Sequence, residues 1–257
     1  MRQLVFILVV LAMGCTTRPA AAEQLVVSLS NHQVAITSNF IGEQLVLFGT
    51  IERAPGMALR PSYDLVVTVV GPRQTLRTRR KQRVLGIWVN VDSREFLRVP
   101  AYLAILSNRP VSQIAPPDIL RRLQIGLGNF LLTQRIGSDI ADTVSDDPFR
   151  KAFVRLQRDH GMYSEVDSAV TFLTSAVFRA AIALPADAPL GQYPIDVKLF
   201  ADGKLVARTN AALEITKTGF EQYVADAARD HGLLYGFATM LLALLTGWIA
   251  SVVFRRD

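Results

Sequence analysis

The sequence is poor in the residues on which most metal and thiol sites depend. Its 257 residues include one cysteine, Cys15, and three histidines, His32, His160 and His231. Because Cys15 lies near the N-terminus, the rest of the chain can form no disulfide and no thiolate metal site. The histidines are far apart and show no metal-binding spacing such as His-Glu-x-x-His. We therefore predict neither a metal nor a cofactor.

Catalytic motifs are missing as well. No serine lies in a Gly-x-Ser-x-Gly elbow, and no glycine-rich loop of the phosphate-binding kind occurs. Lysine and arginine outnumber aspartate and glutamate by 28 to 22, a mild excess that does not indicate a nucleic-acid partner. We predict a protein that is not an enzyme, although a site assembled from scattered residues stays open at this stage.

The longest apolar run lies at the C-terminus. Residues 233–254 carry no charge, and a helix that rises about 1.5 Å per residue makes this run long enough to cross a hydrocarbon core of about 30 Å. Arg255 and Arg256 follow directly, and the positive-inside rule places the tail 255–257 in the cytoplasm. The sequence therefore predicts a single transmembrane helix over 233–254, with the preceding domain in the periplasm of a bacterial inner-membrane protein.

The N-terminus agrees with that topology. Arg2 precedes a short apolar run that ends at Met13, and Ala22 closes a run of three alanines. These features predict a signal peptide over 1–22 that is cleaved after Ala22. Cys15 follows Leu-Ala-Met-Gly, which resembles a bacterial lipoprotein box, so lipidation at Cys15 is the alternative.

Small residues gather on one side of the predicted transmembrane helix. A rotation of about 100° per residue places them in one arc, with Phe237 and Trp248 opposite. Small-xxx-small spacing lets a second helix approach closely, so this arc predicts association with another membrane protein or with a second copy of the chain. A plain lipid anchor is the alternative, because small residues are common in membrane helices. The predicted helix-packing face comprises Gly232, Gly236, Ala243, Gly247 and Ser251.

The segment between the two ends is patterned as strands. Short β-branched runs alternate with turn residues about every ten positions, which predicts a mainly β, Ig-like antiparallel β-sandwich over 23–218. Residues 63–70 are apolar at odd and even positions, so both faces of that strand are expected to be covered. Asp202-Gly203 predicts a tight hairpin turn.

Two further segments have a helical pattern. Leucines at helical spacing from Leu120 to Leu131, and a helix start at Asp146-Asp147-Pro148, predict a helical insertion over about 116–163. Residues 219–232 predict a juxtamembrane helix that precedes the membrane span.

A run of basic residues lies between the predicted strands 63–70 and 84–91. In an extended segment, alternation would place Arg77, Arg79, Lys81 and Arg83 on one face. A solvated hairpin protected from edge pairing would account for this pattern. The functional alternative is contact with an anionic partner: phospholipid headgroups, an acidic protein face or a small oxyanion.

Several stretches resemble one protein family. Residues 31–37 (Asn-His-Gln-Val-Ala-Ile-Thr), residues 79–90 with Trp88, and the tail from Gly191 to Asp257 are similar to the alphaproteobacterial transmembrane protein family called Alph_Pro_TM. The resemblance spans nearly the whole mature chain. It implies no assigned activity and no functional residues, and genes of the family often lie near permeases of the sulfite or sulfonate exporter type.

Together these features predict a single-pass membrane protein in the lipid bilayer. The leading hypothesis is a non-enzymatic accessory subunit of such a permease, whose helix packs against the permease in the membrane. The alternative hypothesis is an anion-binding or sensing module that uses the basic segment from Arg77 to Arg83.

Overall fold

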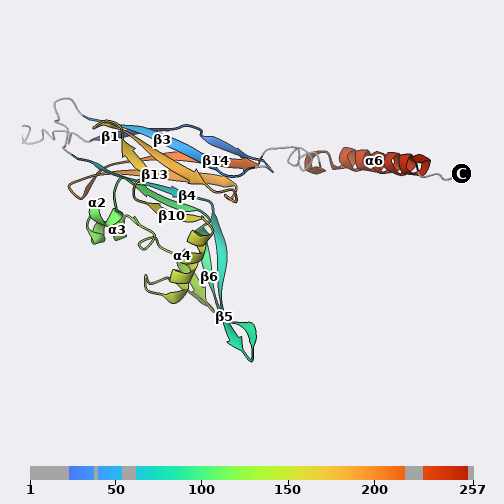
Figure 1. The fold of residues 1–257 in the computed structure, drawn as a ribbon, viewed down its shortest axis with the longest axis horizontal. Helices are drawn as coiled ribbons and strands as arrows, with labels where there is room; N and C mark the ends of the chain where they lie inside the picture. The colour runs from blue at the N-terminus through green and yellow to red at the C-terminus, as the bar shows by residue number, and fades with distance from the viewer. Residues whose placement is uncertain (1–22, 38–39, 54–61, 218–227, 254–257) are drawn as a thin grey trace, which may run out of the picture.

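The computed structural model describes residues 23–37, 40–53, 62–217 and 228–253, with the backbone alone for 252 and 253. The predicted signal peptide, Cys15 and the tail 255–257 lie outside the described residues, as does most of the predicted juxtamembrane helix. The described chain is mainly β with one long C-terminal helix (Figure 1), which confirms this part of the predicted fold.

Two sheets pack face to face and form the body of the domain. The first has the order β1 (Gln24–Leu29), β3 (Glu43–Glu52), β12 (Val177–Leu184), β11 (Val170–Phe172), and all its pairs are antiparallel. The second has the order β10 (Tyr163–Val166), β7 (Leu103–Ser107), β4 (Asp64–Val70), β13 (Gly191–Ala201), β14 (Lys204–Lys217), β2 (Gln33–Ile36). Its edge pairs β10–β7 and β14–β2 are parallel, and the three pairs between them are antiparallel. The antiparallel sandwich is therefore confirmed, whereas its Ig-like character stays a prediction.

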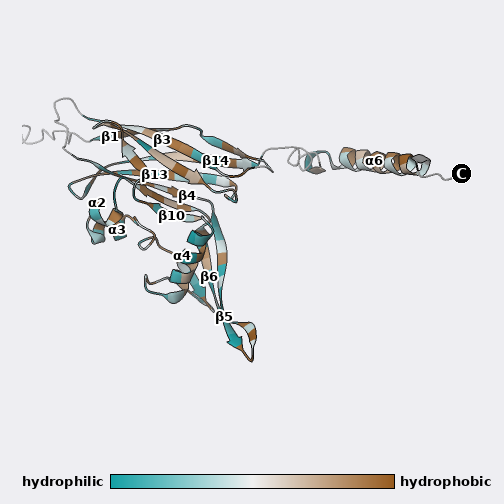
Figure 2. Cartoon of the chain, viewed as in Figure 1, coloured by the Kyte–Doolittle hydropathy of each residue, from teal (hydrophilic) through white to brown (hydrophobic). Residues whose placement is uncertain are grey.

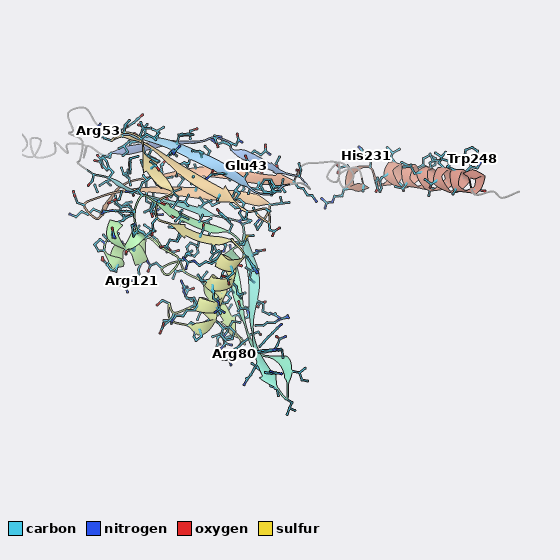
Figure 3. All side chains as sticks on the ribbon, in the orientation of Figure 1. Glu43, Arg53, Arg80, Arg121, His231 and Trp248 are labelled. Atoms are coloured by element: carbon cyan, nitrogen blue, oxygen red, sulfur yellow. The ribbon has the colours of Figure 1, made fainter. Side chains whose placement is uncertain are left out.

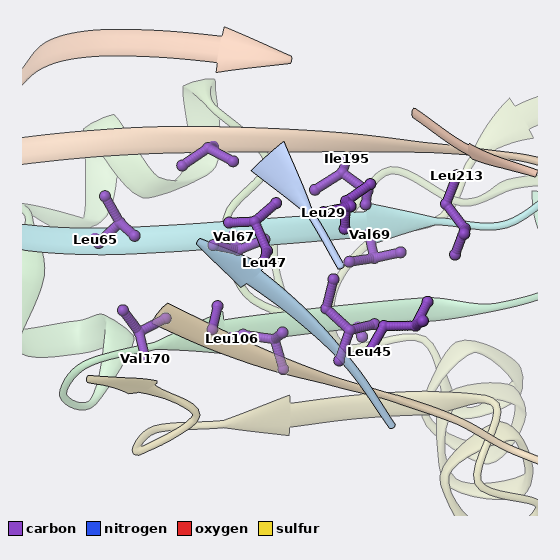
Figure 4. Close-up of a cluster of buried hydrophobic side chains, with 14 of the residues drawn as sticks. Leu29, Leu45, Leu47, Leu65, Val67, Val69, Leu106, Val170, Ile195 and Leu213 are labelled. Carbon is purple, nitrogen blue, oxygen red and sulfur yellow. The ribbon is translucent and has the colours of Figure 1, made fainter. Parts of the chain in front are cut away.

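The main core lies between these sheets. Alternation along each strand sends every second side chain inward, so that Leu65, Val67 and Val69 of β4 meet Leu45 and Leu47 of β3 (Figure 4). All five side chains are 0 or 1% exposed, and each such burial stabilises the fold by about 1.5–3 kcal/mol. The predicted hairpin joins β13 to β14, since Asp202 and Gly203 both have positive φ.

A third sheet leaves the body of the domain at an angle (Figure 1). Its order is β5 (Arg73–Val84), β6 (Ile87–Pro100), β8 (Thr133–Ile136), β9 (Asp139–Asp142). A second core joins this sheet to the outer face of the six-stranded sheet. Phe96 of β6 stacks on Phe153 at 4.4 Å between ring centroids, and Phe153 meets Tyr163 edge-on at 5.8 Å. Because β4 also contributes Val66 to this core, both faces of that strand are covered, as its sequence predicts.

The predicted helical insertion is wrong in its middle part. Short helices α2 (Val111–Ile114) and α3 (Pro117–Arg122) and the longer α4 (Pro148–Asp159) are present, but the hairpin β8–β9 lies between α3 and α4. The leucine spacing does not continue a helix, because Gln124 and Gly126 adopt positive φ directly after α3. The predicted start of α4 is confirmed: the Asp147 side chain accepts hydrogen bonds from the backbone of Phe149 (2.7 Å) and Arg150 (3.1 Å).

The C-terminal helix α6 (Gly232–Val253) is a separate rod. Residues 232–251 form a candidate membrane span that no other described part of the chain buries. Its two threonine hydroxyls donate to carbonyls one turn back, Thr239 to Tyr235 and Thr246 to Leu242, at 3.0 and 2.8 Å. Satisfied hydroxyls of this kind are compatible with a hydrocarbon environment.

Candidate functional site

The hairpin of β5 and β6 is the part of the domain that extends furthest from its cores. The basic run is itself a strand, β5, and pairs along its length with β6, so the extended segment and the hairpin that its sequence predicts are both present. The predicted strand 84–91 is interrupted by the turn Leu85-Gly86, whose φ values are 51° and 87°. Two successive positive φ values suit a two-residue hairpin turn, and glycine adopts such a φ without steric cost.

The structure places the four predicted contact residues in different surroundings. Arg77 lies 3.4 Å from Glu95 on the neighbouring strand, and Arg135 of β8 shares that carboxylate at 3.0 Å. Arg83 donates to the carbonyl oxygen of Gly86 at 3.2 Å, next to the turn.

The other two predicted residues line a groove between β5 and α4. Arg79 and Lys81 lie there with two cations that the prediction did not include, Arg80 and Arg155. The groove has a volume of about 370 Å³, and the rest of its lining is Thr78, Pro148, Phe149, Ala152 and Leu156. None of these residues carries a carboxylate. Four cations that line one groove without a carboxylate are suited to bind an anion.

Phe149 at the start of α4 stacks against arginines of the third sheet. The guanidinium carbon of Arg94 lies 4.7 Å from the centre of the Phe149 ring, and that of Arg80 lies 5.9 Å away, both in range of cation–π attraction. Asp92 pairs with the same two arginines, at 3.0 Å to Arg94 and 3.8 Å to Arg80. Figure 3 labels Arg80 on the projecting hairpin. These contacts link the hairpin to α4 beside the groove.

Arg150 holds α4 in place and is a residue that the sequence analysis missed. Its side chain is buried, and its guanidinium donates to the Thr143 hydroxyl at 2.9 Å and to three backbone carbonyls at 2.7–3.2 Å. Those carbonyls belong to Leu127, Gly128 and Phe130. Burial lowers the pKa of Arg150 below its ordinary value, with Tyr163 and Asp147 opposing that shift. The guanidinium of Arg150 is buried and occupied by these hydrogen bonds, so it is not available to bind an anion.

A second buried cation, Lys198 of β13, was also missed. It pairs with Asp196, which also accepts from Arg208 of β14 at 2.8 and 3.0 Å. Burial lowers the pKa of Lys198, although the Asp196 carboxylate opposes that shift. These side chains border a hollow of about 310 Å³ together with Arg122 of α3 and Thr68 of β4. The sequence carries no signal for this cluster, because its members come from three strands and a helix that only the fold brings together.

The predicted helix-packing face is open along α6. A Cβ atom built on Gly232, Gly236 or Gly247 meets no atom of the described chain within 4 Å. Ala243 and Ser251 are also exposed. The face is thus available to another helix, and the described residues contain nothing that occupies it. Among those residues, no group of three histidine, cysteine, aspartate or glutamate side chains is placed to hold a metal ion.

The chain was also compared with known proteins. No curated protein matches it. A family model described as "Putative transmembrane protein (Alph_Pro_TM)" matches residues 24–256, which is nearly the whole described chain and includes both the β domain and α6. This chain therefore belongs to the Alph_Pro_TM family of transmembrane proteins.

Proposed function

We propose that this protein is a non-enzymatic accessory subunit of a multi-span membrane protein, held to it by the small-residue face of α6. The observation that carries the proposal is that this apolar helix is left wholly uncovered by the rest of the described chain. In lipid, helices associate mainly through close packing and hydrogen bonds, and small residues permit that packing. We place the β domain in the periplasm and the tail in the cytoplasm, on the strength of Arg255 and Arg256.

The partner we propose is a permease of the sulfite or sulfonate exporter type. Its support is the genomic neighbourhood that family membership implies. A second copy of the chain is the competing partner for the same helix face, since an open small-residue face also suits a homodimer.

Copurification of the full-length protein in a mild detergent tests this proposal. Gly236→Leu and Gly247→Leu place bulk on the small-residue face, and we expect each to lower the recovered partner about tenfold. Ala238→Leu is the matched control, because it makes a similar change on the opposite side of α6. If both glycine variants retain every membrane partner at the level of the control, the helix-packing proposal is wrong. Recovery of a second copy alone would replace the permease by self-association.

We propose anion binding or sensing as a second function, supported by the groove between β5 and α4. It gathers Arg79, Arg80, Lys81 and Arg155 without a carboxylate in its lining. Titration calorimetry of the full-length protein with sulfite, sulfate and phosphate is the test. The double variant Arg79→Gln/Lys81→Gln should abolish the heat of binding. The matched control for charge is Arg121→Gln/Arg122→Gln on α3, which should leave it unchanged. Absence of heat from all three anions would refute this second function.

A further inference from the structure

The tip of the β5–β6 hairpin exposes large apolar side chains to solvent. Leu85 at the turn is 99% exposed, and Ile87 and Trp88, which follow the turn, are 69% and 68% exposed. Figure 2 shows hydrophobic colour at this tip, beyond the hydrophilic stretch of β5. Three valines that flank these residues are between 43% and 45% exposed: Val84, Val89 and Val91. Monomeric soluble proteins rarely leave a cluster of this kind uncovered, so it marks a contact surface.

Apolar side chains lie on both faces of the tip. Val84 is paired with Ile87, and Arg83 is paired with Trp88, in successive positions of the antiparallel ladder. Successive pairs point to opposite faces of a sheet, so Ile87 and Trp88 lie on opposite faces, with Leu85 at the end. A flat protein partner would cover only one of these faces, and a stable interface needs about 800 Å² on each side. A narrow tip with apolar side chains on both faces is better suited to insertion into a fluid apolar phase.

A collar of positive charge lies directly behind the tip. From residue 79 to residue 91 the chain contains four cations and no carboxylate, and only Arg80 among them pairs with the nearby Asp92. All four, Arg79, Arg80, Lys81 and Arg83, belong to β5 and are exposed. Long basic side chains can keep their charged ends at headgroup level while apolar neighbours go deeper, and tryptophan prefers the same interface. The charge complements anionic lipid headgroups.

A bilayer is always close to this domain. Fourteen residues, 218–231, separate the end of β14 from α6, and a chain of that length spans at most about 50 Å when fully extended. We propose that the apolar tip of the β5–β6 hairpin inserts into the periplasmic leaflet of the bilayer in which α6 is anchored, while the basic collar contacts anionic headgroups. The hairpin then acts as a second, reversible attachment that sets the orientation of the domain on the membrane.

The two tryptophans of the chain allow a direct test, because Trp88 is at the tip and Trp248 is in α6. Trp248→Phe leaves Trp88 as the only indole. We reconstitute this full-length variant at high dilution into phosphatidylcholine vesicles, and into vesicles that also contain about 30% phosphatidylglycerol. In the anionic vesicles we expect Trp88 emission to shift to the blue and to be quenched by lipids brominated high on the acyl chain. Trp88→Phe, which reports on Trp248, controls for reconstitution and should be quenched in both kinds of vesicle.

Three variants made in the Trp248→Phe background separate the two elements of the proposal. Leu85→Ser/Ile87→Ser should abolish the blue shift of Trp88 emission in the anionic vesicles. Lys81→Gln/Arg83→Gln should reduce that shift at least tenfold through the loss of headgroup contacts. Arg121→Gln/Arg122→Gln on α3 removes the same charge elsewhere and should have no effect.

Two results would overturn the inference. One is Trp88 emission that stays typical of water in both vesicle types. The other is a blue shift that grows with the protein-to-lipid ratio and resists brominated lipids, since that would assign the tip to a contact between copies. These vesicles contain no second protein, so either result is independent of the copurification test of the accessory function.

Discussion

The buried guanidinium of Arg150 offers the clearest quantitative test of the structure. In Arg150→Met, the Thr143 hydroxyl and the carbonyls of Leu127, Gly128 and Phe130 all lose their donor. Hydrogen bonds to charged groups contribute about 1.5–3 kcal/mol each to the free energy of unfolding. The loss of four full hydrogen bonds would therefore unfold most domains. Water can replace part of this loss, because Arg150, Leu127 and Gly128 border an open hollow of about 470 Å³. We therefore expect a destabilisation of about 3–5 kcal/mol, because buried acceptors are left without a donor.

Urea unfolding of the full-length protein in mild detergent, followed by far-ultraviolet circular dichroism, measures this change. Arg150→Lys keeps the charge, but a single ammonium group cannot replace the planar guanidinium that reaches all four acceptors. This variant should lower the free energy of unfolding by about 1–3 kcal/mol. Arg158→Met is the matched control, because Arg158 is exposed on the same helix; it should change the free energy of unfolding by less than about 0.5 kcal/mol. Equal midpoints for Arg150→Met and Arg158→Met would refute the view that Arg150 ties α4 to the segment 127–143.

Three further outcomes follow from particular contacts. Asp147→Ala should cost about 1 kcal/mol in urea unfolding, because it removes the N-cap of α4, whereas Asp146→Ala next to it should be nearly neutral; equal losses would contradict the cap. Gly49→Ala should cost about 1–3 kcal/mol, because its Cβ would lie 2.3 Å from the Phe178 ring, while Gly128→Ala, with open space around it, should be tolerated. Burial raises the pKa of three tyrosines. The native state therefore keeps phenol protons that the unfolded chain releases above about pH 10. As a result, the urea midpoint should fall as the pH rises from about 10 to 11.5. An unchanged or rising midpoint would contradict that sign; the tyrosines are Tyr102, Tyr163 and Tyr193.

The pH effect has one opposing contribution. Burial lowers the pKa of Lys198, so the unfolded chain binds more protons than the native state just below about pH 10.4, and Lys198 alone would make stability rise with pH there. Because three tyrosines lower the free energy of unfolding as the pH rises and one lysine raises it, the net effect is a loss of stability at higher pH. Lys198→Met removes the opposing contribution and should make the alkaline loss begin at a lower pH.

Features encoded by neighbouring residues could be predicted from the sequence. The span in α6 follows from an uninterrupted apolar run, and the turn at Asp202-Gly203 follows from the backbone freedom of glycine. The start of α4 follows from a capping carboxylate before proline. Each of these depends on a few adjacent residues, and each is present in the structure.

Features that depend on long-range pairing could not be predicted in this way. The alternation of the basic run predicted an extended segment, but its pairing with β6 and the register shift between Arg80 and Lys81 appear only in the fold. Leu123 and Leu127 mimic a helix, yet they pack into the second core from a chain turned by Gln124 and Gly126.

The sequence by itself determined that the described chain is mainly β and ends in a helix long and apolar enough to span a membrane, because hydropathy and turn chemistry act over short stretches of chain. The tertiary structure decided which charges are free to act. It holds Arg150 and Lys198 in buried hydrogen bonds and an ion pair, and it leaves Arg79 and Lys81 exposed on the strand that leads to the apolar tip. The physical reason is that burial and pairing depend on residues far apart in the chain, which only the packing of three sheets brings into contact.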